Sequence, residues 1–185
     1  MATTTRHETR FENRTAEEPV SWTAGAALGL RLVMGLVFLT AGLGKLLGEF
    51  SAAGYLANVD PTSPLAGVYG AMAEIPALVA VIDVAIPWGQ LLIGLGLLVG
   101  GLVRLAAFFG GLQMVAFYFG NWEMAGAYEV LTGFATSDLV YLIVFLAIGA
   151  LAAGRVYGLD AVLERYEVDG EPLVERHPRL RYVLG

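Results

Sequence analysis

Four long apolar stretches constrain this chain more than any other feature. They lie at about residues 24–47, 77–103, 105–120 and 138–154. A bilayer hydrocarbon core about 30 Å thick is crossed by a helix of roughly 20 apolar residues, because each residue adds about 1.5 Å. The sequence therefore predicts an all-α membrane protein, with a bundle of four transmembrane helices in residues 23–156.

The composition argues against the alternative of a water-soluble domain with buried helices. Hydrophobic residues make up 57% of the chain, charged residues 15%, and the mean hydropathy is +0.66. Soluble proteins average about 45–50% apolar and about 25% charged residues. The 24 glycines are also typical of membrane helices that pack closely. Three pairs have the small-xxx-small spacing of such contacts: Gly25 with Gly29, Gly44 with Gly48, and Gly96 with Gly100.

The distribution of charged residues predicts the orientation of the bundle. Arginine is concentrated in the N-terminal tail, the turn after the second stretch and the C-terminal tail, at Arg6, Arg10, Arg14, Arg104, Arg155, Arg165, Arg176, Arg179 and Arg181. The other two connections carry acids, at Glu49, Asp60, Glu74, Glu123 and Glu129. Basic residues favour the cytoplasmic side. We therefore expect a multi-pass protein of the plasma membrane with both termini in the cytoplasm.

The segments outside the apolar stretches are polar. Residues 1–22 lack the apolar core of a secretory signal and are predicted as a disordered tail. Residues 157–185 are predicted as a cytoplasmic C-terminal tail. In the first outer connection, Ser63 is expected to cap a short helix that has Pro64 at its first position. In the C-terminal tail, a brief helix is expected at 158–165.

The charge and the missing residue types exclude several functions. The net charge is −6, with one lysine against ten arginines, which is typical of acidic, halophile-like proteins, although a GC-rich genome also replaces lysine by arginine. The negative charge and the absence of a dense basic patch argue against nucleic acid as a partner. The chain has no cysteine, and its two histidines, His7 and His177, lie in the tails. We therefore expect no metal site, no iron–sulfur cluster and no haem held by this chain alone. A redox cofactor inside the bundle would be a quinone or would belong to a partner.

Three polar residues are predicted at similar depth inside the bundle. Counting about 1.5 Å per residue, Arg31, Gln90 and Gln113 reach one layer. Polar side chains at this depth usually face the bundle interior and mark function. Two structural alternatives stand beside this interpretation. In one, the side chain of Arg31 extends to the cytoplasmic interface and binds nothing. In the other, Gln90 and Gln113 form hydrogen bonds between helices and have no further role.

A second group of charged residues is predicted near the outer ends of the helices. Lys45, Asp83 and Asp138 reach similar depths on three different helices. They are ordinary interfacial residues, unless Lys45 lies near the outer mouth of a site around Arg31 and Asp83 reaches the arginine. A guanidinium beside amide side chains in an apolar bundle is suited to bind a quinone carbonyl or a small anion.

Three segments of the chain resemble the DoxX/DoxD family of membrane proteins. RLVMGLVFLTAGLGKL at 31–46 resembles the family's first-helix signature. WGQLLIGLGLLVG at 88–100, followed by VRLAA at 103–107, is similar to its second helix and the turn into the third. AGRVYGLD at 153–160 is similar to the exit from the fourth helix.

The resemblance implies a four-helix membrane bundle and suggests two kinds of function. DoxD-like members are small membrane subunits of thiosulfate:quinone oxidoreductase, and other relatives are membrane partners of redox-stress proteins. Many members have an acidic residue where this chain has Gln90, so carboxylate-dependent chemistry does not transfer.

Two hypotheses from different classes follow. In the first, the chain is a quinone-binding or anchoring subunit of a membrane system that oxidises sulfur compounds. Arg31, Gln90 and Gln113 line the quinone site, Lys45 lies near its outer mouth, and Asp83 is a further candidate. No catalytic residue is assigned. In the second, it is a non-catalytic scaffold in the lipid that docks a protein partner or a second copy of itself.

Overall fold

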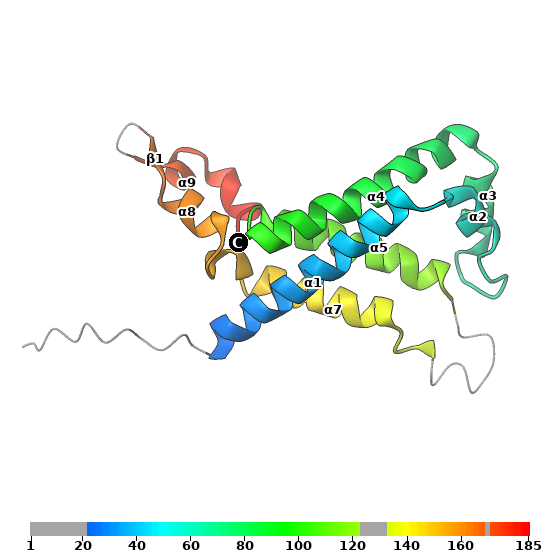
Figure 1. Cartoon of the computed structure of the whole chain (residues 1–185), viewed down its shortest axis with the longest axis horizontal. Helices are drawn as coiled ribbons and strands as arrows, with labels where there is room; N and C mark the ends of the chain where they lie inside the picture. The colour runs from blue at the N-terminus through cyan, green and yellow to red at the C-terminus, as the bar shows by residue number, and fades with distance from the viewer. Residues whose placement is uncertain (1–21, 123–132, 169–170) are drawn as a thin grey trace, which may run out of the picture.

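The computed structural model describes residues 22–122, 133–168 and 171–185, and it is mostly helical (Figure 1). Most of the predicted N-terminal tail lies outside these residues, as do Glu123 and Glu129.

The long helices are α1 (Trp22–Leu47), α4 (Pro76–Val99), α5 (Val103–Gly120) and α7 (Ser137–Ala150). The connection between α1 and α4 contains α2 (Ala52–Ala57) and α3 (Ala66–Ala73). The C-terminal elements are η1 (Ala153–Arg155), α8 (Leu159–Arg165), the paired strands β1 (Glu167–Val168) and β2 (Glu171–Pro172), α9 (Leu173–Arg176) and η2 (Pro178–Tyr182).

Three of the long helices meet the length and hydropathy of a membrane span. These are α1, with 26 residues, α4, with 24, and α5, with 18. Helix α7 is as apolar but has only 14 residues, or about 21 Å at about 1.5 Å per residue. The predicted helical membrane fold is therefore confirmed, with three candidate spans among the described residues. The fourth crossing stays a prediction.

In two of the apolar stretches, the helix ends a few residues before the end that the sequence predicts. Helix α4 stops at Val99 because Gly100 takes a left-handed backbone conformation, with φ at +69°, and α5 starts only at Val103. Helix α7 stops at Ala150, and Ala152 turns left-handed with φ at 48°. Both breaks bring backbone groups to the same end of the bundle, where α1 begins (Figure 1).

Helices α1 and α4 pack most closely because glycines let their backbones meet. A Cβ atom on Gly42 would lie 2.6 Å from the backbone nitrogen of Leu91. A Cβ atom on Gly94 would strike the backbone nitrogen of Leu39. The glycine pairs expected from spacing do not make these contacts, since Gly25, Gly29 and Gly44 have no neighbour within 4 Å at their Cβ positions.

Helices α5 and α7 form the second close pair, and an aromatic contact joins the two pairs. The ring of Phe145 on α7 lies against Gly110 on α5, where a Cβ atom would overlap it. The same ring meets Phe38 of α1 edge to face, with centroids 4.8 Å apart. Around this core the outer faces of all four helices expose large apolar side chains, such as Val33, Leu92, Phe108 and Leu146. Such faces suit contact with lipid.

The bundle has two distinct ends (Figure 1). We call one the Arg31 end, where the start of α1, the α4–α5 turn and the C-terminal elements gather. We call the other the α2–α3 end, after the two short helices that lie there. The element order places the first and last described residues at the Arg31 end.

Candidate functional site

Arg31 is buried and bonded to the backbone of a distant segment. Its side chain is 2% exposed. Its Nη1 donates to the carbonyl oxygens of Ala153 at 2.8 Å and Val156 at 2.9 Å. Its Nε has no hydrogen-bond partner among the described residues. Arg31 therefore ties α1 to the turn that follows α7, and its side chain is enclosed by protein.

Asp160 is the acidic counterpart of Arg31, and sequence reasoning did not assign it a role. It is fully buried, and it interacts electrostatically with Arg31. Its Oδ1 accepts from the backbone nitrogen of Leu102 at 2.7 Å, and its Oδ2 accepts from those of Val103 and Gly185, both at 3.0 Å. The carboxylate thus caps the N-terminus of α5, where the helix dipole favours a negative charge.

Gly100 lies between these two buried charges. A Cβ atom on Gly100 would be 2.6 Å from Nη1 of Arg31, while its carbonyl oxygen accepts from the backbone nitrogen of Asp160 at 2.9 Å. A Cβ atom on Gly158 would be 2.7 Å from the same Nη1. The guanidinium is therefore enclosed by two glycines, and neither position leaves room for a ligand or a side chain.

The structure separates Arg31 from the two glutamines, so the single layer expected from the sequence is not formed. Arg31 lies against Gly100, and Gln90 stands ten residues earlier on α4, about 15 Å away along the helix at about 1.5 Å per residue. Gln90 is 3% exposed, and its Oε1 has no partner among the described residues. The Oε1 of Gln113 is also buried without a partner there.

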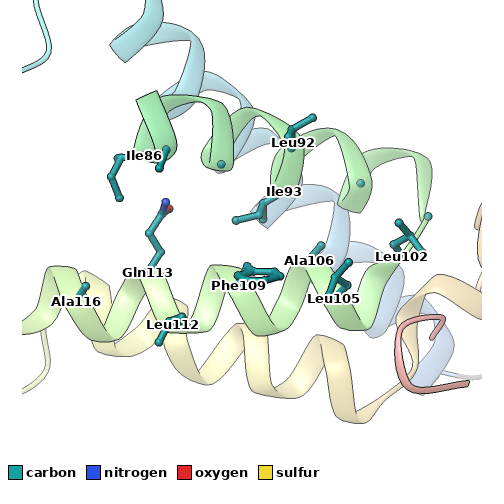
Figure 2. A pocket seen from close by; sticks show the side chains of 14 residues that line it. Ile86, Leu92, Ile93, Leu102, Leu105, Ala106, Phe109, Leu112, Gln113 and Ala116 are labelled. Atoms are coloured by element: carbon teal, nitrogen blue, oxygen red, sulfur yellow. The ribbon is translucent and has the colours of Figure 1, made fainter. Parts of the chain in front are cut away.

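Gln113 belongs to an apolar groove between α4 and α5 (Figure 2). The groove has a volume of about 680 Å³. Its wall is made of small and apolar residues of the two helices and the turn between them, namely Ala85, Ile86, Gly89, Leu92, Ile93, Gly96, Gly101, Leu102, Leu105, Ala106, Phe109, Leu112 and Ala116. Gln113 is the one amide in this lining. Figure 2 shows its side chain reaching from α5 toward α4.

The glutamine amide is aimed at the backbone of α4. A Cβ atom on Gly89 would lie 3.5 Å from Nε2 of Gln113, an ordinary van der Waals distance, so the amide lies close to this turn of α4. Gln113 makes no hydrogen bond to the described part of the chain. An unpaired amide in an apolar groove is costly in lipid and is able to bind a polar group on a ligand.

The charged residues of the α2–α3 end have separate neighbours. Lys45 holds its ammonium 5.8 Å from the ring centroid of Phe50. Asp83 accepts from the backbone nitrogen of Ala52 at 2.6 Å, which supports the start of α2. These contacts do not bring Lys45 and Asp83 to the groove, since neither lines it.

Asp138 and Tyr55 meet in a polar pocket of about 730 Å³ at the α2–α3 end. Asp138 accepts from the amide nitrogen of Asn121 at 2.9 Å. Tyr55 packs its hydroxyl against Gly120. Burial raises the pKa of Tyr55, and the nearby Tyr69 and Asp138 raise it further, because each disfavours a phenolate. The hydroxyl oxygen is shielded from solvent and has no partner in the described part of the chain.

Comparison with known protein families decides what kind of protein this is. The family model described as DoxX matches residues 26–122, which is more than half of the chain. The chain belongs to the DoxX family. Comparison with curated proteins and with solved structures gives no match. The DoxX match covers most of α1 and all of α4 and α5, and with them the groove and all five residues predicted for the site.

The partners of Arg31 lie beyond the DoxX match. Ala153, Val156 and Asp160 all follow residue 122. Asp160 closes the AGRVYGLD segment, but its burial depends on a turn that brings it onto the start of α5. Its one signal in the sequence is an acid directly after Gly158-Leu159, the start of a short helix.

Proposed function

We propose that this DoxX-family membrane protein binds a quinone in the groove between α4 and α5. The observation that carries the proposal is the unpaired Gln113 amide in an otherwise apolar groove of about 680 Å³. A quinone has a polar ring with carbonyl acceptors and an apolar tail. Gln113 Nε2 would donate to a ring carbonyl, and the apolar wall would hold the tail.

In this proposal the five candidate residues have different roles. Gln113 contacts the quinone, and Gly89 forms part of the groove wall beside it. Arg31 stabilises the end of the bundle through its bonds to two carbonyls. Gln90, Lys45 and Asp83 lie outside the groove lining. The chain would supply the quinone site and the membrane anchor of a system that oxidises sulfur compounds, and partner polypeptides would supply the remaining redox groups.

The test is direct binding in lipid. Protein in nanodiscs is titrated with decyl-ubiquinone, and a photoreactive quinone is used to identify the labelled peptide. We expect saturable binding and labelling of α4 or α5. Gln113→Leu should weaken binding about tenfold, since losing one hydrogen bond to a buried acceptor costs about 1–3 kcal/mol.

Gln90→Leu is the matched control, because Gln90 is a buried glutamine outside the groove lining. It should leave quinone binding unchanged. Absence of saturable binding by the wild-type protein, or labelling outside α4 and α5, contradicts the proposal. The scaffold function would then be favoured, since Arg31 already has a structural role.

We propose further that the chain crosses the plasma membrane four times, with α7 as the short fourth crossing and both ends in the cytoplasm. Because the chain has no cysteine, single cysteines report their own side of the membrane. Ala53→Cys, on exposed α2, should react with an impermeant maleimide on intact cells. Val162→Cys, on exposed α8, should react only after lysis. Labelling of both sites on intact cells contradicts this topology.

A further inference from the structure

The groove between α4 and α5 is open along one side. Its described lining residues all belong to these two helices and the turn between them. Three of the lining side chains, Leu92, Phe109 and Leu112, are 64%, 50% and 56% exposed. Since α4 and α5 both have the length and hydropathy of membrane spans, this open side faces lipid. A ligand that lies in the groove is therefore in contact with lipid as well as with protein.

The amide of Gln113 divides the groove into two unequal parts. Along α5, Gln113 stands three residues before Ala116 and eight residues after Leu105, and both of these residues line the groove. At about 1.5 Å per residue, the two separations are about 5 Å and about 12 Å. Figure 2 shows Ile93 and Phe109 between the helices in the longer part, on the side of Gln113 toward the α4–α5 turn. The longer part therefore offers an apolar wall about two helical turns in length.

The shorter part ends where polar bonds to the α2–α3 end begin. Tyr69 on α3 is buried, and its hydroxyl donates to the carbonyl oxygen of Ala116 at 2.7 Å. The hydroxyl of Ser63, which precedes α3, donates to the carbonyl oxygen of Phe119 at 2.7 Å. Ala116 is also the last residue of α5 among the described lining residues. An apolar tail that starts at Gln113 thus finds its apolar wall on the turn side of the amide.

We propose that the groove takes a long-tailed membrane quinone, with the ring at Gln113 and the tail lying along α5 toward the α4–α5 turn. This inference rests on the proposed quinone site and specifies its substrate class and the direction of the ligand. A tailless quinone would still bond to Gln113, but it would leave the longer part of the groove to lipid. A tail that fills this part contributes through close packing against the wall, because lipid itself is as apolar as the tail.

Matched substitutions in the two parts of the groove test the direction of the tail. Leu105→Trp places a bulky side chain in the longer part, and Ala116→Trp places the same side chain in the shorter part. Both variants and the wild type are titrated in nanodiscs with decyl-ubiquinone and with the same quinone ring without a tail, compared at equal concentration in the lipid. An extended decyl chain reaches about 12 Å, at about 1.25 Å per carbon, so its end comes to Leu105 when the ring is at Gln113.

The wild type should bind decyl-ubiquinone more tightly than the tailless ring. Leu105→Trp should weaken the binding of decyl-ubiquinone about tenfold and leave the binding of the tailless ring unchanged, because only the tail packs there. The unchanged binding of the tailless ring also shows that the variant is folded. Ala116→Trp should not distinguish the two ligands. Selective loss of decyl-ubiquinone in Ala116→Trp, or equal effects of Leu105→Trp on both ligands, overturns the inference.

A second measurement uses the wild-type protein alone. Decyl-ubiquinone that carries a photoreactive diazirine at the end of its tail is bound in nanodiscs, and the labelled peptides are identified. We expect labelling within residues 96–106, on both sides of the α4–α5 turn. Labelling within residues 81–86 or 116–120 would show that the tail lies in the opposite direction.

The outcomes separate this inference from the proposed function. Saturable binding that Gln113→Leu weakens and Leu105→Trp does not affect overturns the direction of the tail and leaves the quinone site standing. Absence of binding of either ligand by the wild type overturns the quinone site, and the inference with it.

Discussion

Arg31 and Gly100 are packed so closely that a Cβ atom on Gly100 would lie 2.6 Å from Nη1 of the arginine. The glycine also has a φ angle of +69°, which other residues rarely adopt. One residue thus ends α4, turns the chain and leaves room for a buried guanidinium. The contact explains why α1 meets the α4–α5 turn here, and it leads to the first prediction.

Gly100→Ala should destabilise the protein by roughly 2 kcal/mol or more, since it combines a steric clash with a strained backbone angle. Thermal unfolding in detergent micelles measures the effect. Gly29→Ala is the control, because Gly29 lies inside α1 with nothing within 4 Å of its Cβ position. If both variants unfold at the wild-type temperature, the described contact with Arg31 is wrong.

Arg31→Met should lower the stability by about 3 kcal/mol, because it removes the donor from the buried carbonyl of Ala153 and the part-buried carbonyl of Val156. The same measurement on Lys45→Met should give a change below about 1 kcal/mol, since Lys45 makes one cation–π contact with Phe50. Equal effects of the two substitutions would argue against a structural role specific to Arg31.

Gly42→Ala should weaken the packing of α1 on α4 by about 1–3 kcal/mol, because its methyl group would meet the backbone of Leu91 at 2.6 Å. Gly44→Ala, two residues further along the same helix, has open space and should be neutral or slightly stabilising. Thermal unfolding of the two variants side by side checks this. A reversed order would show that the described helix face is not the packed one.

Tyr55→Phe should make the protein less sensitive to alkaline pH. The pKa of Tyr55 is raised by burial, so the folded state keeps the phenolic proton above about pH 10, where an unfolded tyrosine loses it. Unfolding then releases a proton, and the stability falls as the pH rises from about 10. The loss of melting temperature between pH 9 and pH 11 should shrink in Tyr55→Phe.

The exposed Tyr182, replaced by phenylalanine, is the control for this pH series. Its variant should retain the full alkaline loss. A Tyr55→Phe protein that loses as much melting temperature as the wild type would show that Tyr55 does not hold its proton in the folded state. Part of the loss should remain in any case, because burial also raises the pKa of Tyr69.

Hydropathy and length were enough to predict the long helices, because a span is set by local composition. Helix α1 begins two residues before the predicted stretch and ends with it. The helix expected after Ser63 is present as α3, but Ser63 does not cap it. Its hydroxyl donates to the carbonyl of Phe119 on α5 at 2.7 Å, a distant contact that local sequence rules do not include.

The candidate site was harder to predict because it depends on how helices rotate and where they end. Depth along a helix suggested one layer for Arg31 and Gln113, whereas the left-handed turn at Gly100 brings the C-terminal segment onto Arg31. Gln113 lies in the groove on the side where α4 and α5 diverge from the turn that joins them (Figure 2). Neither the rotation nor the buried partner, Asp160, follows from periodicity, since the long helices are apolar on most faces.

The bonds of Arg31 to Ala153 and Val156 also bear on biogenesis. The arginine precedes these partners by 122 and 125 residues. A chain made from its N-terminus delivers α1 to the membrane well before the turn after α7 exists. The guanidinium must therefore be accommodated by water, lipid headgroups or the insertion machinery until synthesis has passed residue 156. Arg31 therefore gains its hydrogen-bond partners only when the chain is nearly complete, and not when any one helix is complete.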